Sequence, residues 1–262
     1  MIEKGKSFDV VIGLPAYNEE SDLSDLLREI KDVDLDNYVV LVLDDGSTDN
    51  TAQIAGQWSE KIPLVLHRHQ TNRGLGEALR SICSLSMDLL KEDGHLITID
   101  ADRSHRPEQI PELLAKASQG YDFVIASRYT GASRVTGVPA YRRMLSAGTR
   151  VLVRILFGIR QIRDFTSGYR AISRELITRA AGTFPRGLDG LVTESGFPAT
   201  VEILIKCLRI GARPAEIPID LRYDLKRGSS KIRIIRTVLA YLKLFFRLKL
   251  KSVQAPDRPP IG

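Results

Sequence analysis

The chain is poor in cysteine, with only Cys83 and Cys207 among its 262 residues. Both fall in segments that we predict to be helical, and they are too far apart in sequence to suggest a metal-binding pair or a disulfide. So low a cysteine content is typical of proteins in a reducing compartment. The first ten residues, MIEKGKSFDV, contain no apolar signal segment, so we expect no secretion.

Acidic residues are absent from residues 225–251, which contain nine basic residues. The chain has 38 basic and 32 acidic residues, and its last eleven residues hold one of each sign, which leaves 28 basic and 31 acidic residues in 1–224. A nucleic-acid-binding protein usually spreads its basic surface over the folded body. The concentration of positive charge in one C-terminal segment therefore argues against a nucleic-acid partner.

Short apolar runs alternate with segments of helical periodicity. We predict strands at 8–14, 38–43, 63–67, 96–99 and 122–127, with helices between them. Because proline cannot continue a central strand, we expect the first strand to end at Pro15 and a helix to begin near Glu19. Ser47 or Thr48 would cap the following helix. The pattern predicts an α/β fold, with a mostly parallel sheet covered by helices on both faces.

Polar and glycine-containing segments follow these strands, at the sheet edge where open α/β folds bind ligands, and they indicate a nucleotide-type site. The most informative segment is HLITIDADRSHRPEQIP (95–111), in which Asp100 and Asp102 follow a buried strand. In an extended chain these two side chains would point to the same side. Paired carboxylates of this kind suit Mg2+ or Mn2+. The alternative is a solvated turn, where aspartate is also common.

Several motifs together resemble the family-two glycosyltransferases. They are VIGLPAYNEE (11–20), LDDGSTDNT (43–51), GLGEAL (74–79), DADRSHRPEQIP (100–111) and SRYTGAS (127–133). The later part is most similar to the dolichol-phosphate mannose synthase group. It carries Arg142 and Ser146 four residues apart, D-x-T-S-G-Y-R at 164–170, E-x-P-I at 216–219 and G-x-S-K at 228–231. The likeness spans roughly residues 8–245, and an ordered set of motifs is more specific than any one of them.

The resemblance implies a GT-A-type (Rossmann-like) fold with a nucleotide-sugar donor at the sheet edge. It assigns the donor nucleotide to Pro15, Tyr17, Asn18, Glu19, Asp44, Asp45, Gly46 and Asp100. It assigns the metal on the donor diphosphate, Mg2+ or Mn2+, to Asp100 and Asp102, and includes Arg128 with them as a catalytic residue. For Asp44 and Asp45 a turn and helix cap is the alternative, and Asp49 is expected to be structural.

The chain departs from the group in two places. Where the group has D-A-D-L-Q-H, this chain has Arg103, Ser104 and His105, and a serine is too short to replace the amide of glutamine. We expect His105 to be an interfacial or capping residue rather than a ligand. The group's arginine three residues before the glycine of G-x-S-K is Leu225 here, so only Lys231 of that segment is carried over.

The acceptor is inferred from absent motifs. The Q-x-x-R-W motif of processive polysaccharide synthases is missing, and so is an E-D pair that would supply a base. A sugar hydroxyl needs such a base, whereas a lipid monophosphate is already anionic and needs cations to hold it. The resemblance offers Arg128, Arg142, Ser146 and Lys231 for this phosphate. Residues 164, 166 and 167 would shape the pocket or form a structural turn.

Residues 231–251 read as an amphipathic helix. Arg233, Arg236, Lys243 and Arg247 follow one stripe, and the opposite side carries Ile234, Ile235, Val238, Leu239, Leu242, Phe245 and Phe246. The charges recur too often for a membrane span. We expect an interfacial helix on an anionic membrane surface, with a surface helix packed on the body as the alternative. The predicted organisation is a catalytic domain at 1–230, this helix, and a flexible tail at 252–262.

These observations lead to one functional hypothesis and two alternatives. The hypothesis is an inverting, metal-dependent glycosyltransferase, peripheral on the cytoplasmic face of a membrane. It would move a hexose to a polyprenyl or dolichyl phosphate, with mannose from GDP-mannose preferred over glucose from UDP-glucose. Firm anchoring would need a partner subunit or a homo-oligomer. The alternatives are a glycosyltransferase of the same fold acting on a saccharide, and a non-catalytic nucleotide-sugar-binding protein at the membrane.

Overall fold

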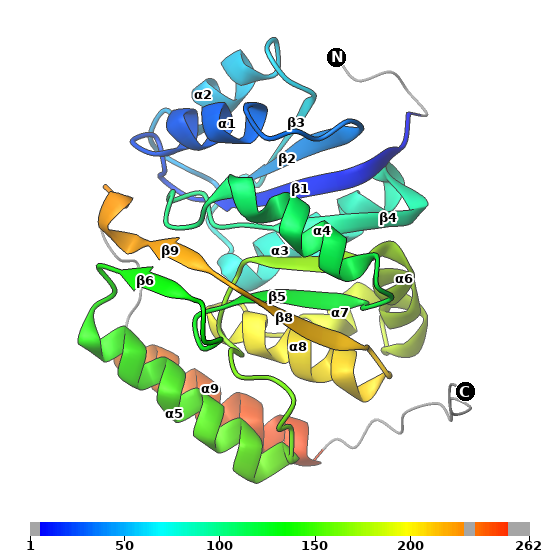
Figure 1. Ribbon diagram of the computed structural model, residues 1–262, viewed down its shortest axis with the longest axis vertical. Coiled ribbons are helices and arrows are strands. Elements are labelled where there is room, and N and C mark those ends of the chain that lie inside the picture. Colours follow the sequence, from blue (N-terminus) through cyan, green and yellow to red (C-terminus); the bar gives the residue numbers. More distant parts are fainter. Residues whose placement is uncertain (1–5, 228–233, 251–262) are drawn as a thin grey trace.

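A computed structural model describes residues 6–227 and 234–250 of the chain (Figure 1). The strands are β1 (Phe8–Ala16), β2 (Tyr38–Asp44), β3 (Leu64–Arg68), β4 (Leu90–Thr98), β5 (Phe123–Ser127), β6 (Arg134–Thr136), β7 (Arg170–Ser173), β8 (Pro214–Pro218) and β9 (Asp220–Arg222). The helices are α1 (Leu23–Lys31), α2 (Thr51–Trp58), α3 (Leu75–Leu89), α4 (Ile110–Ala117), α5 (Ala140–Phe157), α6 (Arg174–Thr183), α7 (Leu188–Leu191), α8 (Pro198–Arg209) and α9 (Ile234–Leu250). Two short 3-10 helices lie at Pro107–Gln109 and Tyr223–Leu225.

The central sheet has seven strands in the order β3-β2-β1-β4-β7-β5-β8. All neighbouring pairs are parallel except those of β7, which runs antiparallel to β4 and β5. The prediction of a mostly parallel sheet is therefore confirmed. Because β7 is reversed, its first residue, Arg170, pairs with Thr98 and Ile125 near the carboxyl ends of β4 and β5. The loop that precedes β7 is thus delivered to the ligand-binding edge.

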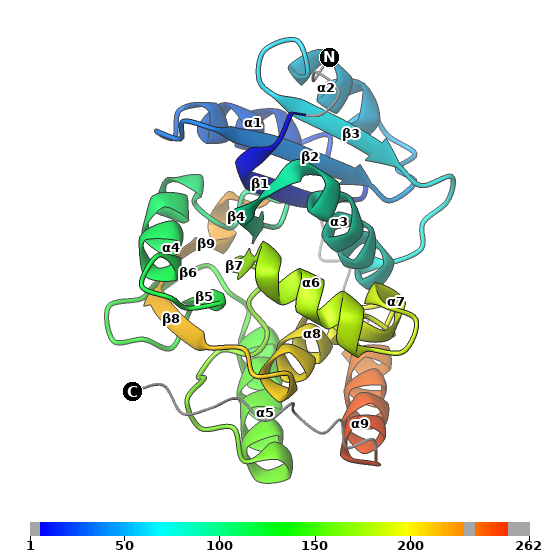
Figure 2. The same cartoon turned by 90° about the vertical axis from the view of Figure 1, so that its right-hand side faces the viewer.

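Helices cover both faces of the sheet, as predicted, and each face has its own core (Figure 2). One core contains apolar side chains of α3, α6 and α8, and the other contains those of α1, α2 and α4. Along β1 the side chains alternate between them, with Val11 in the first core and Ile12 in the second. This alternation follows from the two-residue period of a strand, and burial on both faces explains why β1 and β2 are almost continuously apolar.

Two predicted boundaries at the N-terminal edge are wrong. Strand β1 continues through Pro15, which pairs with Leu43 of β2. The pairing of β1 with β4 ends earlier, at Gly13, so the proline lies where β1 has a partner on one side only, and proline is tolerated there. Helix α1 consequently begins at Leu23 rather than near Glu19. Helix α2 is preceded by Asn50, and neither Ser47 nor Thr48 caps it.

Helices α5 and α9 pack against each other beyond the sheet, next to the small two-stranded sheet of β6 and β9 (Figure 1). Helix α9 lies within the predicted range, while residues 231–233 and 251–262 of the predicted helix and tail lie outside the described residues. Among the described helices, none combines the length and the hydropathy needed to cross a membrane.

The apolar side of α9 is divided between two environments. Tyr241, Leu244 and Phe245 are buried against the body, whereas Leu239, Leu242 and Phe246 are exposed. Arg247, expected on a free polar face, instead forms ion pairs with Glu194 at 2.7 Å and Glu202 at 3.2 Å. The helix is therefore packed on the body and still presents apolar side chains to solvent, which combines features of both sequence interpretations.

Candidate active site

The loops that follow β1 and β2 are joined by hydrogen bonds. The backbone amide of Asn18 donates to Ser47 Oγ at 2.9 Å, and the amide of Thr48 donates to Asn18 Oδ1 at 2.8 Å. The amide of Glu19 donates to Thr51 Oγ1 at 2.8 Å. These bonds bring the predicted donor-binding segment from Pro15 to Glu19 together with Asp44, Asp45 and Gly46. Their contact with a nucleotide stays a prediction.

Asp44 is fully buried at the end of β2 and has a protein partner for each oxygen. Its Oδ1 accepts a hydrogen bond from the amide of Ser47 at 2.9 Å, and its Oδ2 lies 2.9 Å from Arg68 Nε. The first bond is the turn contact that the alternative interpretation of the motif predicts.

Asp45 holds the loop that follows β3. Its Oδ1 lies 2.7 Å from His69 Nδ1, and its Oδ2 accepts a hydrogen bond from the amide of Gly74 at 2.7 Å. The next residue, Gly46, has a φ of +73°, and a Cβ there would lie 2.5 Å from the carbonyl carbon of Thr71. Only glycine accommodates both the conformation and the close approach. Asp45 and Gly46 therefore fix the 69–74 loop beside the end of β2.

Asp100 and Asp102 lie in a turn beyond the end of β4, not in the extended chain that we expected. Arg103 completes the turn with a φ of +57°. Its guanidinium group forms ion pairs with Asp25 at 2.9 Å and Glu29 at 2.5 Å, both on α1. The turn is thus anchored to the N-terminal half of the protein, and it still brings the two carboxylates together.

Asp102 is nearly buried and already has partners. Its Oδ1 accepts hydrogen bonds from the amide of Ser104 at 3.1 Å and from Ser104 Oγ at 2.5 Å. Its Oδ2 forms an ion pair with the ammonium group of Lys226. Burial by itself raises the pKa of the Asp102 carboxyl, but the Lys226 charge and these hydrogen bonds outweigh it and lower the pKa to about 2. Ser104 therefore orients Asp102.

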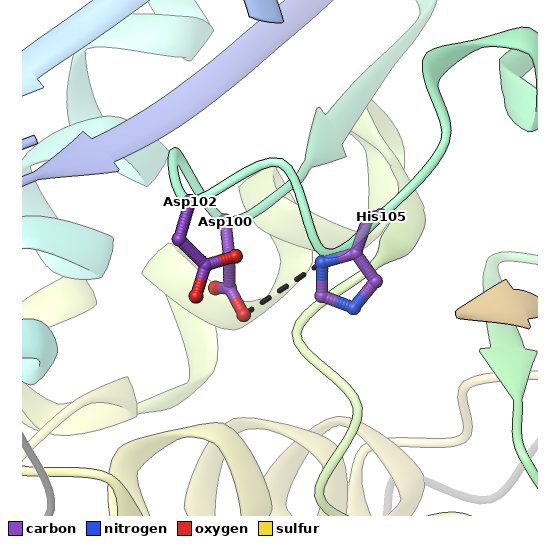
Figure 3. A group of neighbouring side chains, drawn as sticks. All are labelled: Asp100, Asp102 and His105. Carbon is purple, nitrogen blue, oxygen red and sulfur yellow. Dashed lines mark ion pairs between the residues drawn. The ribbon is translucent and has the colours of Figure 1, made fainter. Parts of the chain in front are cut away.

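Asp100 has a different environment. Its side chain is 42% exposed and makes no hydrogen bond with the described residues, and its Oδ2 lies 3.7 Å from His105 Nδ1 (Figure 3). One ligand atom from each of Asp100, Asp102 and His105 can be chosen so that all lie within 4.8 Å of one another. Two carboxylates and an imidazole are an ordinary ligand set for a divalent ion, so the residues fit the predicted metal. The D-x-D-x-x-H spacing was the sequence signal for His105.

A second polar cluster surrounds Arg128, which follows β5. Its Nε and Nη2 donate to the two oxygens of the buried Asp164, at 2.7 and 2.6 Å, in a bidentate pair. Nη2 also contacts Ser146 Oγ at 3.2 Å and Thr166 Oγ1. Burial alone would lower the pKa of the Arg128 guanidinium, but Asp164 raises it above its ordinary value. Arg128 is therefore charged and fixed, and its Nη1 makes no hydrogen bond with a described residue.

A single pocket connects the two clusters. Among the residues that line it are Asp100, Asp102, His105, Arg128, Arg142, Ser146, Thr166, Tyr223 and Tyr241. The guanidinium group of Arg142 lies 4.9 Å from the centre of the Tyr223 ring. Of the predicted acceptor residues, the structure brings Arg128, Arg142 and Ser146 together, whereas Lys231 lies outside the described residues. Arg227 contacts Ser21 and Asp25 instead.

Sequence reasoning missed several residues of this pocket. Lys226 pairs with Asp102, although the basic run at 225–231 gave no indication of which side chain would reach the carboxylates. Tyr223 and Tyr241 come from segments without a motif. Asp164 was expected to shape the pocket or form a turn, and it does both, because it also accepts hydrogen bonds from the amides of Thr166 and Ser167.

Comparisons with known proteins agree with the motifs. Residues 11–179 match the family model "Glycosyl transferase family 2". The chain is 32% identical over 243 residues to a dolichol-phosphate mannosyltransferase of Pyrococcus furiosus, a match that covers 91% of this chain and 63% of that protein. It is 33% identical over 221 residues to an undecaprenyl-phosphate mannosyltransferase of Micrococcus luteus, covering 84% of this chain and 85% of that protein. The chain thus spans less than two thirds of the first of these relatives.

Among solved structures, the chain is similar to glucosyl-3-phosphoglycerate synthase from Mycobacterium tuberculosis, which was crystallised with Mn2+, uridine diphosphate and glucosyl-3-phosphoglycerate. The TM-score is 0.62 at 24% sequence identity, and the match covers 95% of this chain and 81% of that one. This likeness confirms the predicted GT-A-type fold.

Proposed function

Because the chain belongs to glycosyl transferase family 2, we propose that it is an inverting hexosyltransferase that acts on a polyprenyl or dolichyl phosphate. The preferred donor is GDP-mannose, since the relatives from Pyrococcus furiosus and Micrococcus luteus are named as mannosyltransferases of lipid phosphates. The single observation that carries the proposal is the pocket that joins the Asp100–Asp102 carboxylates to the Arg128 cluster.

The Arg128 cluster suits an anionic acceptor. A phosphate monoester carries its own negative charge, so it needs orientation and charge neutralisation rather than a base. Arg128 is held by Asp164 with Nη1 unused by the described residues, and Ser146 and Arg142 line the same pocket. Fixed guanidinium groups of this kind recognise phosphate with little loss of conformational freedom on binding.

The carboxylate side of the pocket suits the donor. Asp100 and Asp102 would hold a divalent ion, which would stabilise the charge of the departing nucleoside diphosphate as a Lewis acid. Ser104 orients Asp102, and Arg103 anchors the turn to α1 through Asp25 and Glu29. The donor diphosphate would thus lie opposite the acceptor phosphate in one pocket, which is the arrangement that direct, inverting displacement requires.

The α5–α9 pair supports a position at a membrane surface. Exposed apolar side chains on these helices are Met144, Val151, Ile155, Val238, Leu239, Leu242, Phe246 and Leu250, and several of them, including Met144 and Phe246, are at least 70% exposed. The exposed basic residues on the same helices include Arg143, Arg154, Arg236, Lys243 and Lys249. Apolar side chains flanked by basic ones favour the interface of an anionic bilayer. Both helices also contribute residues to the pocket.

The test is transfer of labelled sugar from a panel of GDP- and UDP-sugars to polyprenyl phosphate in liposomes, with Mg2+ or Mn2+ present. We expect labelled lipid from one donor, with Arg128→Lys and Arg142→Ala both impaired and the exposed-site control Arg160→Ala unaffected. Transfer to a soluble saccharide without any labelled lipid would support the saccharide-acceptor alternative. Donor binding without turnover on either acceptor would support the non-catalytic alternative.

Membrane binding is tested separately, by co-sedimentation with vesicles that contain anionic lipid. Replacing an exposed apolar side chain of α9 with an acidic one, Phe246→Asp, should weaken binding. The matched control is Ala115→Asp on α4, an exposed apolar-to-acidic change on a helix that packs on the sheet. Equal vesicle binding by both variants would argue against the α5–α9 surface. A dimer that Phe246→Asp dissociates would assign this surface to a second copy of the chain.

A further inference from the structure

His105 has a buried nitrogen that nothing in the described part of the structure satisfies. The residue is 5% exposed, and its Nδ1 is buried without a hydrogen-bond partner among the described residues. Buried polar atoms in proteins are nearly always paired, with protein groups, water or an ion. The unpaired Nδ1 therefore points to a partner that is absent from the protein chain.

The partner of Nδ1 is not the nearest carboxylate. Nδ1 lies 3.7 Å from Asp100 Oδ2, a distance too long for a hydrogen bond (Figure 3). It is, however, compatible with two ligands of one ion, because atoms that each bind a metal at about 2.1 Å lie up to about 4.2 Å apart. Asp100 also lacks a hydrogen bond with the described residues, so both groups face each other with ligand atoms unused.

The other neighbours of His105 explain the position of its ring but not its nitrogen. The ring packs against Tyr169, with ring centres 5.3 Å apart and planes inclined at 60°. The hydroxyl of Ser104 is directed to Asp102 Oδ1 and is not turned toward the space between Asp100 and His105. The interfacial role that the sequence suggested for His105 therefore accounts for its contact with Tyr169 and leaves Nδ1 unexplained.

Resting on the divalent ion of the proposed function, we propose that His105 Nδ1 is its third protein ligand and makes the site select Mn2+ over Mg2+. Mg2+ takes oxygen ligands almost exclusively, whereas imidazole suits transition metals such as Mn2+. The proton of the neutral imidazole is then on Nε2. Two carboxylates and one imidazole leave coordination positions for the diphosphate oxygens of the donor.

The direct test is electron spin echo modulation of Mn2+ bound to the full-length protein, which detects a nitrogen nucleus coordinated to the ion. We expect a nitrogen coupling in the wild-type protein that changes on 15N-histidine labelling and is absent from His105→Asn. The control His67→Gln, an exposed histidine on β3, should keep the coupling. Bound Mn2+ without a nitrogen coupling, or no Mn2+ binding by the folded protein, would overturn the assignment.

Metal affinities provide the second test. His105→Asn should lower the Mn2+ affinity by at least about tenfold and change the Mg2+ affinity much less, so that the preference between the ions shrinks. Equal losses for the two ions would assign His105 a structural role. These readouts are independent of sugar transfer. A nitrogen coupling in a protein that labels no lipid would keep this inference and reject the proposed acceptor.

Discussion

Two pairs of aspartates follow strands of the same sheet, yet their surroundings are opposite. Asp44 and Asp45, after β2, have side chains that are 0% and 5% exposed, and both oxygens of each have partners within the protein. Asp100, after β4, is 42% exposed and makes no hydrogen bond with the described residues. Asp102 is intermediate, since its partners are a serine two residues away and the ammonium group of Lys226.

The comparison shows that neighbouring donors, rather than residue type or position in the sheet, separate a structural carboxylate from a ligand-binding one. A carboxylate that accepts several backbone hydrogen bonds stabilises the loop that donates them. A carboxylate without such donors gains its partner only when a ligand arrives. Asp45 is an example of the first kind and Asp100 of the second. Substitutions at the two positions should therefore affect different quantities.

The largest effect is expected at the exposed carboxylate. Asp100→Asn should lower the sugar-transfer rate by about a thousandfold, since it removes a charged group that acts at the developing negative charge. The free energy of unfolding should change by less than about 0.5 kcal/mol, because no hydrogen bond within the described protein is lost. Transfer assays and urea denaturation measure the two quantities. Full activity with a verified donor and metal would reject the assignment, and the exposed Asp34→Asn is the control.

Asp164 extends the structural group and gives a pH-dependent prediction. Asp164→Asn leaves the buried Arg128 without its counter-ion and should lower the free energy of unfolding by about 3 kcal/mol near neutral pH. Burial alone raises the pKa of Asp164, but Arg128 outweighs it and holds the pKa below its ordinary value. A lowered pKa contributes stability above about pH 4, and this contribution is lost as the pH falls toward the folded-state pKa.

The measurement for Asp164 is urea denaturation of both proteins between pH 7 and pH 3.5. The difference in unfolding free energy between wild type and Asp164→Asn should be constant at the upper end and shrink below about pH 4. An exposed substitution, Asp36→Asn, should show no comparable loss at pH 7. A difference that does not vary with pH would mean that the ion pair with Arg128 is not its source.

A smaller loss of stability is expected at Asp45. Asp45→Asn should lower the free energy of unfolding by about 2 kcal/mol, because a charged acceptor of the amides of Arg73 and Gly74 is lost. Denaturation by urea measures this change. Donor affinity of the folded variant then separates the two roles of the residue. An unchanged affinity would reject the predicted contact with the nucleotide and leave Asp45 as a purely structural residue.

Much of the fold could be predicted from the sequence because the relevant signals are local. The apolar runs that became β1, β2 and β5 and the periodic segments between them identify a parallel sheet without any long-range information. The end of β1 was wrong because the rule against proline assumes two partner strands, and β4 has already left β1 at Pro15. Which strand borders which is a tertiary fact that the local pattern does not contain.

The site was predicted where motifs exist and missed where the chain folds back. Asp100, Arg128 and Ser146 lie in motifs, and the structure brings them into one pocket. Lys226 reaches Asp102 from 124 positions along the chain, and no spacing rule anticipates such a contact. The exposed apolar residues of α5 were missed for a related reason. Periodicity identifies the faces of a helix but does not tell which face the body covers.

Lys226 tests how close Asp102 is to either class of carboxylate. Burial lowers the pKa of the Lys226 ammonium, but Asp102, with smaller contributions from Glu19 and Asp100, raises it above its ordinary value. A positive charge therefore already lies where a divalent ion would bind. Lys226→Met removes this competitor, so the affinity for Mn2+ in the absence of donor should rise by about fivefold, equivalent to about 1 kcal/mol, the net strength of one hydrogen bond.

Calorimetric titration of the donor-free protein with Mn2+ measures the effect, and the exposed Lys31→Met on α1 is the matched control. A rise in affinity in the Lys226 variant alone would mean that Asp102 is a ligand-binding carboxylate whose intramolecular partner is displaced by the metal. A fall would mean that Lys226 keeps Asp102 in position for the ion, as Ser104 does. Asp102 would then resemble Asp45 in depending on its protein partners, and the contrast between the two pairs would rest on Asp100 alone.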